Sequence, residues 1–169
     1  MAFGSVALKG ASMFLRIIEF CCAAIILGIF SYFLATLHNH GLHIDTYIRA
    51  VEGISGAAVI YTLFALLLVC CLGGIAFFSI LGMVLDLAFT GAFIYIAWAT
   101  RGGASSCKGN VNTPFGSGNT NIDNTVSNGN GGFTRLPSLK TACRLETATF
   151  AVAIVGMYVL SLFFSTARN

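Results

Sequence analysis

Four long apolar stretches constrain the fold of this chain more than any other feature of its sequence. They run from about residue 14 to 37, 53 to 71, 74 to 100 and 145 to 166. A helix of roughly 20 apolar residues crosses the hydrocarbon core of a bilayer, and each stretch approaches or exceeds that length. We therefore expect an all-α membrane protein, a four-transmembrane-helix antiparallel bundle that forms a single domain over residues 1–169.

Composition agrees with a lipid-facing surface and argues against several classes of function. Only 9% of the residues are charged, against roughly 25% in a soluble domain, and the mean hydropathy is +0.87. The net charge of +3 comes from scattered residues, so we expect no nucleic-acid partner. The chain contains no Gly-x-Ser-x-Gly turn and no glycine-rich phosphate loop. We expect a protein that is not an enzyme and that carries no cofactor.

The connections between the stretches differ in length and character. Residues 38–52 form a short polar loop, and residues 71–74 form a tight turn, so the second and third stretches make an antiparallel hairpin. The segment of residues 101–144 is long and rich in Gly and Asn. Such a segment buries too little apolar surface to fold alone, and we expect it to be a flexible loop outside the membrane.

Basic residues and cysteines predict opposite orientations. Four spans put both termini on one side, and the loop side carries more basic residues than the terminal side, which favours cytoplasmic loops. The terminal side has Lys9, Arg16 and Arg168, and the loop side has Arg49, Arg101, Lys108, Arg135, Lys140 and Arg144. Cys107 and Cys143 bracket the long loop, where an oxidising compartment could join them. The adjacent pairs Cys21-Cys22 and Cys70-Cys71 are candidates for S-palmitoylation, a cytoplasmic modification.

Short segments near the helix ends carry a family resemblance. The first stretch opens with Phe14-Leu15-Arg16-Ile17-Ile18-Glu19-Phe20, and the third holds Leu85-Asp86-Leu87 and ends in Ala97-Trp98-Ala99-Thr100-Arg101. Cys107 follows, and the fourth stretch begins with Cys143-Arg144-Leu145-Glu146-Thr147-Ala148. The chain thereby resembles the MARVEL-domain tetraspan family, in its fungal branch of non-classical export and eisosome-associated proteins. The resemblance implies cytoplasmic termini, a Cys107–Cys143 disulfide, a role in membrane domains or vesicle traffic, and no catalytic residues.

Asp86 is the single carboxylate of the third stretch and lies near the membrane centre. A charge at that depth is costly, so we expect the side chain to face other helices. One hypothesis is a proton or ion site of a small transporter or channel. The favoured one is a protonated Asp86 that bonds a hydroxyl of a neighbouring helix, with Tyr61, Thr62 or Ser55 as partner. A transport path needs several polar groups across the bundle, and the sequence offers one.

The other charged and polar groups of the spans lie near the helix ends. We expect structural ion pairs that reach the interface, formed by Arg16 with Glu19, Arg49 with Glu52, and Glu146 with Arg101 or Arg49. His38, His40 and His43 form a loose cluster, but a structural zinc site normally has four ligands. We therefore expect a polar interfacial loop there and no metal.

These features together predict a non-enzymatic scaffold that sorts lipids and proteins in plasma-membrane domains or vesicle traffic, with both termini cytoplasmic. Its partners would be membrane lipids, including sterols or sphingolipids, and other integral membrane proteins. Small-residue faces such as Ala24-x-x-x-Gly28 permit close helix packing and suit a homo-oligomer. Two alternatives stay open: an accessory subunit of a larger membrane enzyme or transporter complex, and a small transporter or channel that uses Asp86.

Overall fold

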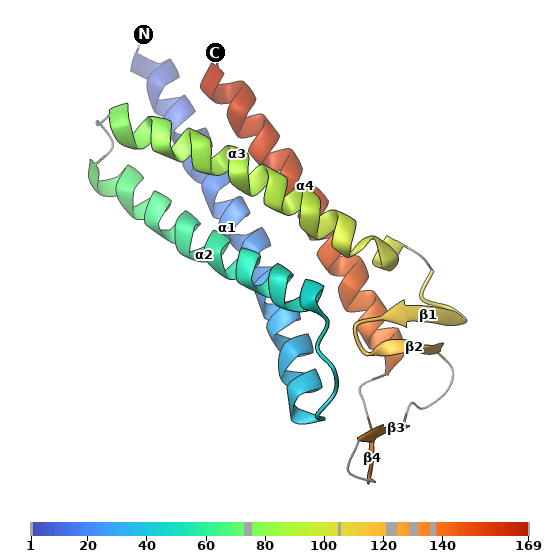
Figure 1. Ribbon diagram of the computed structural model, residues 1–169. Coiled ribbons are helices and arrows are strands. Elements are labelled where there is room, and N and C mark those ends of the chain that lie inside the picture. The colour runs from blue at the N-terminus through green and yellow to red at the C-terminus, as the bar shows by residue number, and fades with distance from the viewer. Residues whose placement is uncertain are drawn as a thin grey trace.

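The computed structural model of the chain is a bundle of four long helices with two small β-hairpins at one end (Figure 1). It describes residues 2–72, 76–104, 106–120, 125–128, 132–135 and 138–168. The long helices are α1 (Ala2–Asn39), α2 (Thr46–Leu72), α3 (Ala76–Ala99) and α4 (Leu139–Arg168). The connection from α3 to α4 contains the 3-10 helix η1 (Arg101–Ala104) and the strands β1 (Asn110–Thr113), β2 (Gly116–Asn119), β3 (Thr125–Asn128) and β4 (Gly132–Arg135).

All four helices are long and apolar enough to cross a membrane, which confirms the predicted fold class. The apolar segments of the described residues are Met13–Asn39, Thr46–Leu67, Leu81–Ala99 and Leu139–Leu162. The second and fourth begin before the predicted starts at 53 and 145. Their first turns contain polar residues, and these turns continue the same helices.

The helices run alternately up and down, so both termini lie at one end of the bundle (Figure 1). We call this the terminal end, and the opposite end, with η1 and the hairpins, the loop end. Helix α1 packs against α2 and α4, and α4 packs against α3. In the described residues, α2 and α3 contact each other much less than these pairs do. The cross-section is therefore a ring that is least tightly closed between α2 and α3.

The core is built from one face of each helix. On α1 it includes Ile26, Phe30, Phe33 and Leu37, whose spacing of three and four residues is that of a single helical stripe. Helices α3 and α4 approach closely, because a Cβ at Gly156 would lie 2.8 Å from the Phe93 ring. That position needs glycine.

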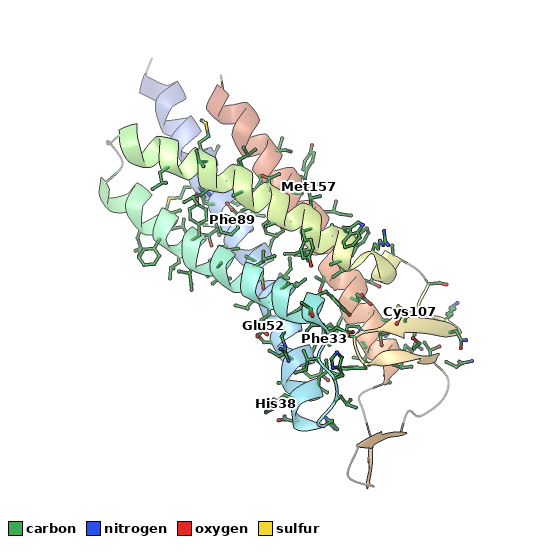
Figure 2. The ribbon with its side chains drawn as sticks, viewed as in Figure 1. Phe33, His38, Glu52, Phe89, Cys107 and Met157 are labelled. Carbon is green, nitrogen blue, oxygen red and sulfur yellow. A yellow bond between two sulfur atoms is a disulfide. The ribbon has the colours of Figure 1, made fainter. Side chains whose placement is uncertain are left out.

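Part of the long loop is packed, contrary to the predicted flexible segment. Strands β1 and β2 pair in an antiparallel hairpin with Thr113 opposite Gly116. Val111 and Phe115 are buried in the core cluster. The Phe115 ring meets the Phe33 ring edge-on, with 5.3 Å between the ring centres; Phe33 is labelled in Figure 2. The expectation of an unpacked loop is therefore wrong for residues 110–119. The β3–β4 hairpin has no contact with a helix in the described residues.

Candidate functional site

A buried ion pair joins α1 to α3 inside the membrane-spanning part of the bundle. The Arg16 guanidinium donates from Nη1 and Nη2 to the two carboxylate oxygens of Asp86, each at 2.5 Å. Asp86 is 0% exposed and Arg16 is 6% exposed. No Cα of α1 lies within 8 Å of a Cα of α3 in the described residues. The long arginine side chain therefore bridges a gap that the helix backbones leave open.

Tyr61 links α2 to the same ion pair. Its hydroxyl donates to Oδ1 of Asp86 at 2.8 Å and lies 3.2 Å from the carbonyl oxygen of Gly82. The Arg16 guanidinium lies 5.6 Å from the centre of the Tyr61 ring, and this ring stacks on Phe89 at 4.8 Å. The cluster of Arg16, Tyr61 and Asp86 thus holds together three helices at the least tightly closed side of the ring.

Glu19 completes the cluster and unbalances its charge. Its Oε2 accepts from Nη1 of Arg16 at 3.0 Å, but its buried Oε1 has no hydrogen-bond partner. The cluster holds one guanidinium and two carboxyl groups, so ionisation of both carboxyls leaves one excess negative charge. An excess charge is costly in apolar surroundings. Neutrality therefore needs one proton or cation more than these side chains supply.

The structure confirms two of the predicted polar contacts of this cluster and corrects others. The pairing of Arg16 with Glu19 and the bond from Tyr61 to Asp86 are both present. Thr62 and Ser55 instead donate to carbonyl oxygens of their own helix. The prediction that Arg16 reaches the interface is wrong. Its side chain is buried, because Asp86 offers it a fully buried bidentate partner.

Glu146 is the second buried carboxyl group without a complete set of partners. It is 5% exposed, and its Oε2 has no hydrogen-bond partner. The predicted pairing with Arg101 or Arg49 is wrong, since no ion pair to Glu146 forms within the described residues. Arg101 lies over the Trp98 ring at 4.9 Å. In place of the predicted bond to Arg49, Glu52 accepts a hydrogen bond from Ser31 at 3.0 Å.

The Glu146 side chain faces a cleft at the loop end. The cleft has a volume of about 340 Å³ and is formed by the start of α2, the end of α3, η1, β1 and α4. Its polar lining comes from Asp45, Tyr47, Arg101, Asn112, Thr113 and Glu146. A second cleft of about 510 Å³ lies beside the disulfide and is lined by Lys108, Lys140 and Arg144 among others. Neither cleft is lined by Asp86.

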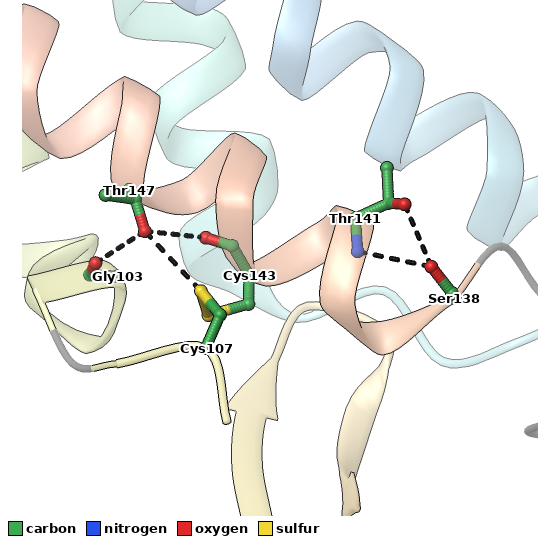
Figure 3. Close-up of a disulfide and its surroundings, with 6 residues drawn as sticks. All are labelled: Gly103, Cys107, Ser138, Thr141, Cys143 and Thr147. Carbon is green, nitrogen blue, oxygen red and sulfur yellow. Dashed lines mark hydrogen bonds between the residues drawn. A yellow bond between two sulfur atoms is a disulfide. The ribbon is translucent and has the colours of Figure 1, made fainter. Parts of the chain in front are cut away.

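A disulfide joins Cys107 to Cys143 and ties the long loop to the start of α4 (Figure 3). The two Cα atoms are 5.8 Å apart, and 36 positions separate them in sequence. Next to the disulfide, the Thr147 hydroxyl lies 2.6 Å from the carbonyl oxygen of Gly103 and 2.9 Å from that of Cys143. Ser138 caps the first turn of α4 by accepting from the backbone N–H of Thr141.

The structure describes only part of the remaining predicted cysteine and histidine sites. Cys21 is exposed and Cys22 is buried in the core, so Cys21 is the accessible thiol of that pair. The side chains of Cys70 and Cys71 lie outside the described residues. His40 lies with Nδ1 2.7 Å from the carbonyl oxygen of Thr36. Within the described residues, no three His, Cys, Asp or Glu side chains gather as metal ligands would.

Comparison of the chain with protein-family models, with curated proteins and with solved structures finds no match. The resemblance to the MARVEL-domain family therefore stays a prediction.

Proposed function

We propose that this protein is a non-enzymatic scaffold that gathers particular lipids and partner proteins around itself in a membrane domain. The observation that carries the proposal is the contrast between its interior and its exterior. Inside the spans, the Asp86 carboxylate is closed off by Arg16 and Tyr61. Outside, large apolar side chains project along all four helices (Figure 2). Those exposed include Phe14, Ile60, Phe64, Leu67, Val84, Leu87, Trp98 and Tyr158.

The position of the clefts supports a function carried by the surface. The two clefts described above lie at the loop end, outside the polar cluster of the spans. A transporter needs a polar path that reaches its intramembrane charge, and the oxygens of Asp86 already accept three hydrogen bonds from protein donors. A bundle of this kind is suited to act by its shape, its helix lengths and its outer packing.

The same proposal puts both termini in the cytoplasm and the loop end outside the cell, at the plasma membrane. The disulfide supports this orientation, because disulfides persist in oxidising compartments. The excess of basic residues on the loop side opposes it under the positive-inside rule. Ala24 and Gly28 favour a second copy as one partner, since a Cβ at Gly28 would meet nothing within 4 Å. The proposal includes sterols or sphingolipids among the lipids that the protein gathers in this membrane domain.

Mass spectrometry of the lipid shell tests the proposal. The full chain is extracted from its native membrane in polymer nanodiscs, and co-isolated lipids and proteins are compared with the bulk membrane. We expect a distinct lipid set around the protein, and we expect the triple substitution Val84→Ala, Leu87→Ala and Tyr158→Ala to alter it. Lys108→Ala, at an exposed position of the loop, is the control and leaves the set unchanged.

A shell identical to the bulk membrane, with no co-isolated protein, would contradict the scaffold. A single partner protein at fixed stoichiometry, with no lipid preference, would replace the scaffold by an accessory subunit of a larger complex.

A further inference from the structure

Glu146 lines the loop-end cleft and, unlike the buried carboxyl groups of Glu19 and Asp86, forms no ion pair within the described residues. Asp86 and Glu19 both bond Arg16. Glu146 is as deeply buried as these groups, but Oε2 has no partner and no ion pair forms within the described residues. A buried polar atom without a partner costs about 1–3 kcal/mol, and more when it is charged. Oε2 of Glu146 therefore lacks a hydrogen-bond donor.

The surroundings of Glu146 define the shape and charge of that donor. A Cβ on Gly102 would lie 3.7 Å from Oε1 of Glu146 and 3.9 Å from both Oε2 and the carbonyl oxygen of Asn112. Three acceptor oxygens, from two groups, thus surround the position that a side chain at Gly102 would take. Asp45 adds a second carboxylate to the lining, and Tyr47 adds an aromatic ring. This set of groups suits an ammonium ion.

Arg101 gives the same cleft an anion-binding end. It lines the cleft, and its guanidinium lies over the ring of Trp98, which is 59% exposed on the outer face of α3. A guanidinium held in this way is a good partner for phosphate. The cleft thus offers the buried carboxyl group of Glu146, the exposed carboxylate of Asp45 and a guanidinium beside the lipid-facing surface. This arrangement is complementary to a zwitterion with a phosphate and an ammonium group.

The height of the cleft along the bundle favours a lipid over a soluble molecule. The apolar segment of α2 begins at Thr46, and that of α3 ends at Ala99. The cleft lies at these two ends, so it is at the level of the lipid headgroups. Trp98 is of the residue type that is enriched at this level. A volume of about 340 Å³ is near the lower limit of small-molecule sites and suits a headgroup, while the acyl chains would follow the exposed apolar face of α3.

We propose that this cleft binds the headgroup of an amine-bearing phospholipid from the loop-end leaflet, with its ammonium group on Glu146 and Asp45 and its phosphate on Arg101. The assignment rests on the proposed function in taking a lipid as the occupant. It adds one specific headgroup site to a surface that otherwise selects lipids by shape.

Native mass spectrometry of the purified full chain with defined lipids tests this assignment. Phosphatidylethanolamine and phosphatidylglycerol with identical acyl chains share the phosphate and differ in the group beyond it, which is an ammonium group in the first and an uncharged diol in the second. We expect the wild type to retain the ethanolamine lipid about tenfold better, which is the effect of one charge-assisted hydrogen bond. Glu146→Gln keeps the shape of the side chain and is expected to abolish this preference. Glu52→Gln is the matched control, because Glu52 is bonded to Ser31 outside the lining of the cleft, and it keeps the preference.

One further variant and one soluble ligand separate the possible outcomes. Asp45→Asn changes a carboxylate whose side chain is 56% exposed, so it tests the site in a variant with little risk of misfolding, and it is expected to lower the preference. Equal retention of both lipids by the wild type, or an unchanged preference in Glu146→Gln and Asp45→Asn, would overturn the assignment. Binding of free phosphoethanolamine without retention of the lipid would also overturn it.

The scaffold and the headgroup site fail in different ways. A distinct lipid shell that is insensitive to Glu146→Gln leaves the scaffold standing without the site. A shell like the bulk membrane, together with a retained ethanolamine lipid that depends on Glu146, leaves the site standing without the scaffold.

Discussion

At the scale of single residues, charge balance decides which substitution in the polar cluster this bundle tolerates. Arg16 pairs with both Glu19 and Asp86. Removing it leaves two buried carboxyls without a counter-charge, whereas removing Glu19 leaves a balanced, bidentate pair. The three residues are therefore unequal, although all of them are buried and hydrogen-bonded.

We expect Arg16→Gln to lower the free energy of unfolding by about 3–5 kcal/mol, the usual effect of removing one partner of a buried ion pair. Glu19→Gln is expected to change it by less than about 1 kcal/mol, because it removes the excess charge and keeps the Arg16–Asp86 bonds. Unfolding of both variants in the same detergent, followed by circular dichroism, checks the difference. Equal losses for the two variants would show that charge balance does not govern the cluster.

Sequence reasoning found the members of this cluster but not their assembly. The spacing of Arg16 and Glu19 predicted their contact, since residues three apart share a helical face. Asp86 lies 70 positions from Arg16, and no local pattern connects them. The available signal was electrostatic: a cation and a carboxylate in different spans, each costly in lipid, gain most by meeting. The predicted partners of Glu146 are wrong, because its position at a helix end does not reveal where the long loop packs.

At the scale of elements, η1 and α4 are joined by a contact between backbones. A Cβ on Gly103 would lie 2.5 Å from the backbone nitrogen of Thr147 and 2.6 Å from the carbonyl carbon of Glu146. Backbone atoms cannot move aside as a flexible side chain can. The adjacent Gly102 has room, because a Cβ there would come no closer than 3.7 Å to Glu146.

Two alanine substitutions one residue apart are therefore expected to differ. Gly103→Ala forces η1 away from α4 and lowers the free energy of unfolding by about 1–3 kcal/mol, as overpacking does. Gly102→Ala is the control and stays close to the wild type. Thermal unfolding of both variants, with the disulfide intact, measures the effect. Similar melting curves for both variants would contradict the close contact.

The β1–β2 hairpin shows how an apolar pattern in a polar loop can be overlooked. Val111 and Thr113 alternate with exposed residues in β1 and are buried, and Phe115 in the turn after β1 is buried too. This period of two is the pattern of a half-buried strand, but it spans only a few residues within a loop rich in Gly and Asn. The long spans are recognisable from the sequence alone, because their length and apolarity specify helices that cross a bilayer. Their packing order did not follow from the sequence, since every span is apolar on all sides.

Phe115→Ala is expected to release this hairpin while the four helices stay folded. The ring is buried and contacts Phe33, and removing a buried Phe side chain typically costs about 3–5 kcal/mol. Hydrogen exchange should become fast over residues 110–119 and stay slow in the cores of α1 and α4. Replacing the exposed Asn110 by Ala is the control. Loss of protection throughout the helices would contradict a locally docked hairpin.

At the scale of the whole molecule, both termini lie at one end of the bundle (Figure 1), and Cys107 of the disulfide lies at the other (Figure 2). The proposed orientation therefore makes a prediction for intact cells. A membrane-impermeant thiol reagent added from outside is expected to label Cys107 and Cys143 only after reduction. A Cys107→Ser, Cys143→Ser variant is the control and shows no labelling at the loop end in either condition. Labelling without reduction, or only after the membrane is opened, would contradict the proposed orientation.

The central claim is that the polar groups within the spans serve cohesion between helices, so that the protein acts through its exterior. Ion and proton flux through liposomes that contain the purified protein tests it most directly, with the wild type and Asp86→Asn measured side by side. We predict the same background flux for both as for protein-free liposomes. Flux above background in the wild type that Asp86→Asn abolishes would show a working path through the bundle and would contradict the account.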